Sequence, residues 1–401
     1  MRIKSSSPLS RGLKAAAALS LMSFASLPRR ASTASVVVLG IAGVVAVLIA
    51  VLAMSTGITQ SIAGSGRDDR AIVLRTGAGT ELVSILTLAE ATAIMDAAGV
   101  KRDVQGKPIA SAEPLTLVEL RLADGTPANV PLRGVSRTET LRPEITLASG
   151  RMFQPGVREV IIGQTAQSQF RNLRVGSRIE SREASWEVVG TFVSSGTMHD
   201  SEVLADAATV MSSYKRRALQ SVLVQLQSPA AFATFKAAVA EDPTLRVDVV
   251  QESSYYASVA KPITDPLRRL AYVVGGIMAA GAMFATLSCV YVAVSSRARE
   301  IATLRALGFG ATAVVFAVVL ETLLLALTGG GIGVAVSWLG FGGKTLNTSG
   351  GGLVQLTYTM AVTAGPIMVG LGWAGAIGLL AGLFPAVHAA RQSIPTGLRA
   401  V

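Results

Sequence analysis

The chain has few of the side chains that bind metals or form covalent bonds. Its 401 residues include one cysteine and two histidines. Cys289 lies inside an apolar run, so no disulfide can form within the chain, and we expect it to be a small packed hydrophobic residue. His199 has no second histidine and no cysteine in its segment, so a metal site there would need carboxylates such as Asp200 and Glu202. We expect no metal site and no catalytic cluster, and we expect His199 to lie in a solvated loop.

A complete nucleotide-binding loop is also missing. Gly343-Lys344-Thr345 matches the end of a phosphate-binding loop, but the first glycine of that motif would fall at position 338, where the chain has Trp338. We therefore expect no ATP-hydrolysing module and no cofactor in this chain.

Long apolar runs are what the sequence has in abundance. Half of its residues are hydrophobic and the mean hydropathy is +0.51. Four runs reach the length of a bilayer crossing: 34–56, 270–294, 311–339 and 365–387. The residues from Ala34 to Met54 alone would span roughly 31 Å as a helix, close to the hydrocarbon thickness. The composition predicts an integral membrane protein with four transmembrane helices.

Acidic residues are absent from the first 33 residues, which carry six Lys and Arg. The net charge of +11 is concentrated there, in the 295–310 loop and in the tail, whereas Ser55 to Arg269 holds 24 basic and 23 acidic residues. By the positive-inside rule, both termini and the 295–310 loop are expected to be cytoplasmic and segment 57–269 to lie outside. This distribution argues against a nucleic-acid partner.

The segments outside the four runs have different expected roles. In 1–33, Leu13, Ala17, Leu21 and Phe24 recur at helical spacing, which predicts an amphipathic elbow helix on the inner membrane surface; a cleaved signal peptide is the alternative. Segment 295–310 is expected to be a cytoplasmic coupling segment, 340–364 an extracytoplasmic loop, and 388–401 a cytoplasmic tail.

Segment 57–269 is expected to form an α+β domain with its own core. Asp124-Gly125 suits a hairpin turn between two of its strands, and Pro262 and Pro266 are expected to interrupt a helical stalk before the second span. The strands expected here are 71–74, 115–122, 129–135, 159–162, 186–193 and 221–226. The expected helices are 88–98, 163–170, 204–214 and 229–240. The predicted fold class is a four-helix transmembrane protein with this domain inserted between spans one and two.

The charged stretch after the second span is a candidate docking surface. Ile301, Leu304 and Leu307 recur at three-residue steps, so a short amphipathic helix could offer an apolar stripe to a partner. The residues we expect to carry the contact are Arg297, Arg299, Glu300, Ile301, Leu304, Arg305 and Leu307.

Within the spans, one acid and several glycines are unusual. Glu321 lies ten residues into the third run, where an acid indicates a helix–helix hydrogen bond or an ion partner. Gly329 with Gly333, and Gly378 with Gly382, form pairs that allow close helix approach. Packing within the chain and pairing with a second copy both remain open.

Three stretches carry a family resemblance: REIATLRALGF with ETLLLALTGGGIG, GLFPAVHAAR with IPTGLRA in the tail, and ASGRMFQPGVREVIIGQTAQSQF in the domain. They resemble the FtsX-like permease subunits of ABC transporters, of the MacB and LolC/LolE type, with a MacB-like periplasmic core domain. The resemblance implies a separate cytoplasmic ATPase that carries ATP and Mg and docks on the 297–309 segment.

The expected function is therefore that of a permease subunit in the cell inner (plasma) membrane. It would couple ATP hydrolysis to movement of the outer domain for efflux or extraction of a substrate, the mechanotransmission seen in MacB-like systems. A second permease copy, as a homodimer or heterodimer, membrane lipids and a periplasmic adaptor are further candidate partners. The alternative is an FtsX-like signalling or scaffold protein that regulates a cell-wall hydrolase.

Overall fold

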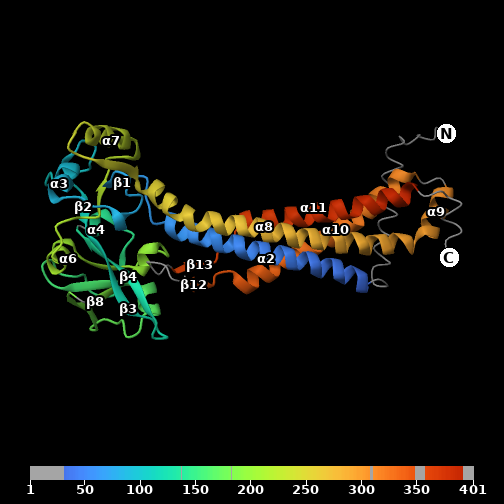
Figure 1. Ribbon diagram of the computed structural model, residues 1–401, viewed down its shortest axis with the longest axis horizontal. Coiled ribbons are helices and arrows are strands. Elements are labelled where there is room, and N and C mark those ends of the chain that lie inside the picture. Colours follow the sequence, from blue (N-terminus) through green and yellow to red (C-terminus); the bar gives the residue numbers. More distant parts are fainter. Residues whose placement is uncertain (1–30, 137, 182, 308–309, 348–356, 392–401) are drawn as a thin grey trace, which may run out of the picture. The chain divides into compact units, whose positions relative to one another are not determined.

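The computed structural model describes residues 31–136, 138–181, 183–307, 310–347 and 357–391 (Figure 1). The chain divides into two compact units. A helical unit comprises Met1–Thr56, Asp265–Gly343 and Ala361–Val401, and an α+β unit comprises Gly57–Thr264 and Lys344–Met360. The elbow helix expected at 1–33 lies outside the described residues except for its last three, which belong to the first long helix.

Four described helices are long and apolar enough to cross a membrane, as predicted. They are α2 (Ala31–Ala63), α8 (Glu252–Ser295), α10 (Ala311–Phe341) and α11 (Ala364–Arg391). Helix α8 continues through Pro262 and Pro266, so the expected interruption of the stalk was wrong. A proline inside a helix removes one backbone hydrogen bond, which the long apolar helix around it tolerates.

Within the helical unit, α2 supplies much of the buried surface. Its Ile41, Val45 and Ile49 belong to one core cluster with Ala326 of α10 and Ala374 of α11. Figure 1 shows α10 and α11 running alongside each other. Large aliphatic side chains on one helix thus pack against small ones on two others, which lets the helix axes approach closely.

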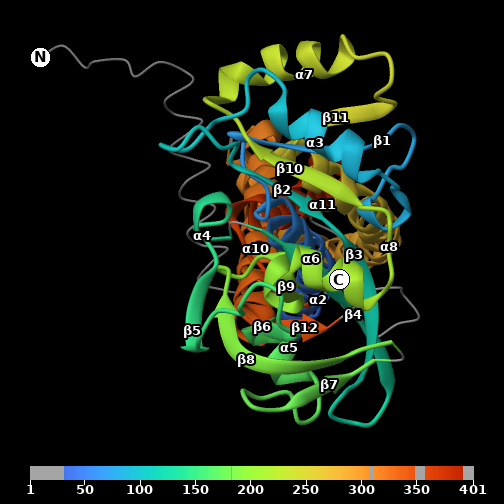
Figure 2. The ribbon, with the colours of Figure 1, turned by 90° about the vertical axis from the view of Figure 1, so that its left-hand side faces the viewer.

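The described part of the α+β unit contains two larger sheets (Figure 2) and a two-stranded pair. The first is antiparallel, with strand order β11-β1-β10-β2, and we call it with its helices the four-stranded lobe. Its strands are β1 (Arg70–Arg75), β2 (Ala110–Glu113), β10 (Ser221–Gln225) and β11 (Val247–Gln251). Its helices are η2 (Glu81–Val83), α3 (Leu88–Asp96), η4 (Pro229–Ala231) and α7 (Phe232–Ala240).

The second sheet is mixed and interrupts the first in the sequence, between β2 and β10. We call it with its helices the seven-stranded lobe; its order is β3-β4-β9-β6-β8-β5, and β7 pairs with β8. Its strands are β3 (Leu115–Arg121), β4 (Pro127–Val135), β5 (Thr146–Gly150), β6 (Glu159–Gly163), β7 (Arg178–Glu180), β8 (Ser185–Val193) and β9 (Val203–Asp206). Its helices are α4 (Thr138–Leu141), α5 (Gln164–Gln169), η3 (Met198–Ser201) and α6 (Ala207–Ser213). A short pair, β12 (Thr345–Asn347) and β13 (Thr357–Thr359), completes the α+β unit.

Local signals explain several of these elements. Gly125 adopts φ 90° in the turn between β3 and β4, as the predicted Asp-Gly hairpin requires. Thr87 and Glu90 form a capping box at the start of α3. Asp206 ends β9 and caps α6 through its side chain.

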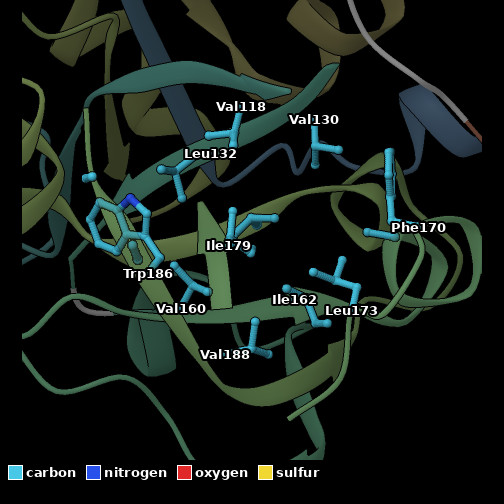
Figure 3. Packing of buried hydrophobic residues seen from close by; sticks show 14 of the residues in the cluster. Val118, Val130, Leu132, Val160, Ile162, Phe170, Leu173, Ile179, Trp186 and Val188 are labelled. Carbon is cyan, nitrogen blue, oxygen red and sulfur yellow. The ribbon is translucent and has the colours of Figure 1, made fainter. Parts of the chain in front are cut away.

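The four-stranded sheet has its apolar core on one face, whereas the seven-stranded sheet has buried apolar clusters on both faces. In the seven-stranded lobe, the larger cluster contains Trp186 of β8, Val130 and Leu132 of β4, and Val160 of β6 (Figure 3). In the four-stranded lobe, Ala71 and Val73 of β1 face α3 and α7. Because successive strand residues point to opposite faces, Arg70 lies on the face away from Ala71 and Val73, and Arg133 lies on the face away from Val130 and Leu132.

Candidate functional sites: the coupling segment and a buried ionic network

The predicted coupling segment forms helix α9 (Ala298–Ala306), between α8 and α10. Arg297 precedes it, and Leu307 closes its last turn. Helix α10 begins after Gly310, which is its N-cap residue and has an extended backbone. The expected short charged helix is therefore present between the two apolar helices.

The predicted contact residues differ in exposure. Arg299, Glu300 and Leu307 are exposed, with Leu307 at 73%, whereas Arg297, Ile301 and Arg305 are half-buried. The side chain of Leu304 lies outside what the structure describes. The buried side of α9 is provided by Ala302, at 5% exposed. Of the large apolar side chains in this segment that the structure describes, Leu307 is the exposed one, so a partner could contact it.

Glu321 has an ion partner in this segment. Its Oε2 lies 3.4 Å from Nη1 of Arg297, and the two side chains are 19% and 14% exposed. A lone carboxylate this deep in an apolar helix would be expensive, and the guanidinium neutralises it. The ion pair connects the N-cap residue of α9 with a residue in the first half of α10.

The four predicted packing glycines lie against helices of the same chain. A Cβ added to Gly329 or Gly333 would stand 2.7 Å from the carbonyl oxygen of Val38 or Ala42 on α2. Toward α11, a Cβ on Gly378 would stand 2.6 Å from the Cβ of Ala326 on α10, and one on Gly382 would stand 3.0 Å from Thr322.

The hydroxyl of Ser337 donates to the carbonyl of Ala46, 3.1 Å away, and extends the contact of α10 with α2. Helix α10 thus contacts α2 and α11 through small residues.

Outside the predicted sites, the α+β unit contains a set of buried charged residues that we call the ionic network. Its members come from both lobes and from the first residue of α8. They are Arg70, Glu81, Glu113, Arg133, Arg142, His199, Glu202 and Glu252, each at most 5% exposed.

Arg133 of β4 is the centre of the ionic network. Its five N–H donors make five hydrogen bonds of 2.6–3.0 Å to three glutamates. Glu81 and Glu113 belong to the four-stranded lobe, and Glu202 belongs to the seven-stranded lobe. The hydroxyl of Ser221 also donates to Glu81, at 2.7 Å. A guanidinium keeps its charge at any ordinary pH, so this group of carboxylates is held by a permanent cation.

His199 is a second member whose role follows from its partners. Nη1 of Arg142 lies 3.1 Å from Nε2 of His199, and Nδ1 of His199 lies 3.0 Å from Glu202. Arginine can only donate, so Nε2 accepts and Nδ1 carries the proton that His199 donates to Glu202. The neutral imidazole relays a hydrogen bond from Arg142 to Glu202, and the solvated loop expected for His199 was wrong.

The third part of the network binds the start of α8. Nε of Arg70 lies 2.6 Å from Oε2 of Glu252, which also accepts from the backbone N–H of Arg67 at 3.0 Å. Arg70 donates to the carbonyl of Leu141 and to Glu144 of the seven-stranded lobe. One turn later, the hydroxyl of Tyr255 accepts from the backbone N–H of Glu81 at 3.0 Å.

Burial and neighbouring positive charge have opposite effects on the pKa values of the carboxyls in the ionic network. Burial alone would raise the pKa of Glu202, but the charge of Arg133 and the contact with His199 hold that pKa well below its usual value. The same opposition lowers the pKa of Glu81, where Arg133 again outweighs burial. Both carboxyls are therefore ionised in the folded domain.

The ionic network was not predicted from the sequence, although the sequence contains one signal of buried charge. Arg70 and Arg133 stand in strands whose neighbouring residues are almost all apolar, and a charged side chain in a buried strand needs a partner. Among the described residues, no group of three or more His, Cys, Asp and Glu is arranged to hold a metal ion. Arginines of the same domain already pair with the carboxylates of the network, so its chemistry suits a structural role inside the domain.

Two family models match the chain one after the other. The MacB-like periplasmic core domain matches residues 31–242, and the FtsX-like permease C-terminal domain matches residues 272–394. A search of curated proteins found no match.

Solved structures of two related domains resemble parts of the chain. The extracellular domain of the noncanonic ABC-type transporter YknZ from Gram-positive bacteria shares 14% identity over 45% of this chain and 99% of its own, with a TM-score of 0.35. The periplasmic region of MacB from Actinobacillus actinomycetemcomitans shares 12% identity over 50% of this chain and 97% of its own, with a TM-score of 0.37. At these scores the likenesses carry no further argument.

Four apolar helices and the inserted α+β domain define a multi-pass membrane protein of the permease class. The chain belongs to the FtsX/MacB-type permeases of ABC transporters. Transporters of this type include a partner ATPase.

Proposed function

We propose that this permease couples ATP hydrolysis by a separate cytoplasmic ATPase to movement of its α+β domain, and that the movement exports or extracts a substrate outside the membrane. The observation that carries the proposal is the order of the two matched domains, with α9 between the second and third apolar helices. The exposed charged and apolar residues of the α9 segment suit the docking of a partner protein.

The proposed route for the movement follows the chain. A partner bound to α9 would act on α10 through the Arg297–Glu321 ion pair, since both side chains are largely buried. It would act on α8 directly, because only two residues separate α8 from α9. Helix α8 begins in the ionic network, so its displacement would reach the α+β domain along one continuous helix.

Replacing Leu307 with Asp tests the docking step. This leucine is 73% exposed, so the change should leave insertion and folding intact while placing a charge where the partner packs. We expect Leu307→Asp, like Leu304→Asp, to abolish co-purification with an ABC ATPase encoded beside this gene and to remove its stimulation by the permease. Leu88→Asp, at a 58% exposed leucine of α3, is the matched control.

Unchanged co-purification of Leu307→Asp and Leu304→Asp would contradict docking on α9. Sidedness is tested separately with a membrane-impermeant maleimide on a Cys289→Ala background. We expect Asp124→Cys to be labelled from outside and Leu307→Cys only after the membrane is opened. Stimulation of the ATPase by a wall hydrolase and by no exported compound would favour the signalling function instead.

A further inference from the structure

Buried charged residues pair where the two lobes of the α+β domain meet. The buried members of each described apolar cluster belong to one lobe, and Met211 of α6 is a partly buried residue of the seven-stranded lobe that packs against the core of the four-stranded lobe. The buried charges, in contrast, pair across the lobes: Arg133 of β4 with Glu81 and Glu113, and Arg142 with Glu113. The contact is therefore directional, because bidentate arginine–carboxylate pairs allow one geometry, whereas apolar surfaces can slide.

Strand geometry explains why these residues meet. On β1, Arg70 and Ile72 lie on the face opposite Ala71 and Val73, which face the core of the four-stranded lobe. On β10 and β2, Ser221 and Glu113 are directly paired in the register and share that opposite face. One face of this sheet thus forms the apolar core and the other presents the charged partners of the seven-stranded lobe.

The start of α8 is bound to the same cluster. Glu252 forms an ion pair with Arg70, and Oε1 of Glu252 lies 3.9 Å from Nη1 of Arg142. Tyr256 is buried with its ring edge against His199 at a centroid distance of 5.8 Å. The first turn of α8 therefore contacts both lobes through side chains of the ionic network.

We infer that the ionic network is an electrostatic joint, which holds the two lobes in one orientation and locks the first turn of α8 to both of them. The buried ion pairs add little net stability, since desolvation offsets most of their attraction, but they select a single arrangement. The joint is strongest at Arg133, whose five donors are all used. It is weaker at Glu252, whose Oε1 has no hydrogen-bond partner in the described part of the chain. This inference concerns the domain itself and does not depend on the proposed function.

The joint can be tested on the full chain in nanodiscs by distance measurements between spin labels, on a Cys289→Ala background. Three exposed sites serve as labels: Lys236 on α7 for the four-stranded lobe, Ser168 on α5 for the seven-stranded lobe, and Ser254 for the first turn of α8. The labels are introduced in pairs as cysteines.

Glu113→Gln removes the carboxylate that two arginines of the other lobe share, and it keeps the size of the side chain. We expect the distance distribution between positions 236 and 168 to widen about twofold, because the lobes lose their fixed orientation. For Glu252→Gln we expect the pairs that include position 254 to widen while the pair 236–168 stays narrow. Glu159→Gln is the control, since its bidentate pair with Arg151 lies within one lobe.

Hydrogen exchange on the same samples separates loosening from unfolding. The joint is supported when the distributions widen while the amides of β1 and β6 stay protected. It is overturned when Glu113→Gln and the double variant Glu81→Gln/Glu113→Gln both leave the lobe distance unchanged. It is also overturned when β1 and β6 lose protection together, because the network would then be part of one common core.

Discussion

The contacts inside the helical unit and the contacts inside the α+β unit differ in kind. In the helical unit, α10 meets α2 and α11 through glycine, alanine and serine, so specificity comes from shape. Between the lobes of the α+β unit, specificity comes from charges placed opposite one another. In lipid there is no water to displace between helices, so close van der Waals contact is the remaining source of association. In a domain surrounded by water, apolar cores stabilise each lobe and buried charges define how the lobes meet.

The largest effect should come from removing the centre of the ionic network. Arg133→Met removes the cation that Glu81, Glu113 and Glu202 share and leaves only Glu113 paired with an arginine, Arg142, which should lower the opening free energy of the β4 amides by about 3–5 kcal/mol. The measurement is hydrogen exchange of the full chain in micelles. The control is Arg151→Met, because Arg151 is 51% exposed and should change the value by at most about 1 kcal/mol. Equal effects of the two variants would show that charge in the network has no special role.

An intermediate effect should come from the glycine contacts of the helical unit. Gly378→Ala places a methyl group 2.6 Å from the Cβ of Ala326, so α10 and α11 must separate. We expect a loss of about 1–3 kcal/mol in stability, measured by denaturation in mixed micelles. Gly375→Ala on the same helix meets nothing within 4 Å and should be neutral or slightly stabilising, since alanine favours helix. A neutral Gly378→Ala would mean that this helix pair is not closely packed.

The smallest expected effect is a change in how the stability of the α+β domain depends on pH. Because the pKa values of Glu81 and Glu202 are lowered in the folded domain, the unfolded chain binds more protons as the pH falls below about 4.3. Their stabilisation is present above that value and is lost on acidification, with each carboxyl contributing at most about 1.4 kcal/mol per pH unit. Asp200, whose pKa is raised mainly by burial, acts in the opposite direction. Glu202→Gln should flatten the acid limb of the hydrogen-exchange profile, whereas an unchanged limb would contradict the assignment.

Much of the fold could be predicted from the sequence because its signals are local. The four apolar runs became four long helices, and the strands expected at 115–122, 129–135 and 186–193 became β3, β4 and β8. Two errors had local causes as well. The helix expected at 204–214 begins at Ala207, because β9 occupies the preceding residues. The strand β2 (Ala110–Glu113) was missed because its residues ASAE have low strand propensity and depend on β10 for pairing.

The sequence by itself determined that the chain has four membrane-length helices, an inserted α+β domain and a short charged helix after the second span, because hydrophobic length and periodicity are properties of neighbouring residues. Only the tertiary structure decided which distant residues meet. Arg297 pairs with Glu321 across 24 positions, and Arg133 pairs with Glu81 across 52. A single charge in a strand or helix shows that a partner is needed, but its identity depends on how the chain packs, since the cost of burial is met by whichever opposite charge the fold brings near.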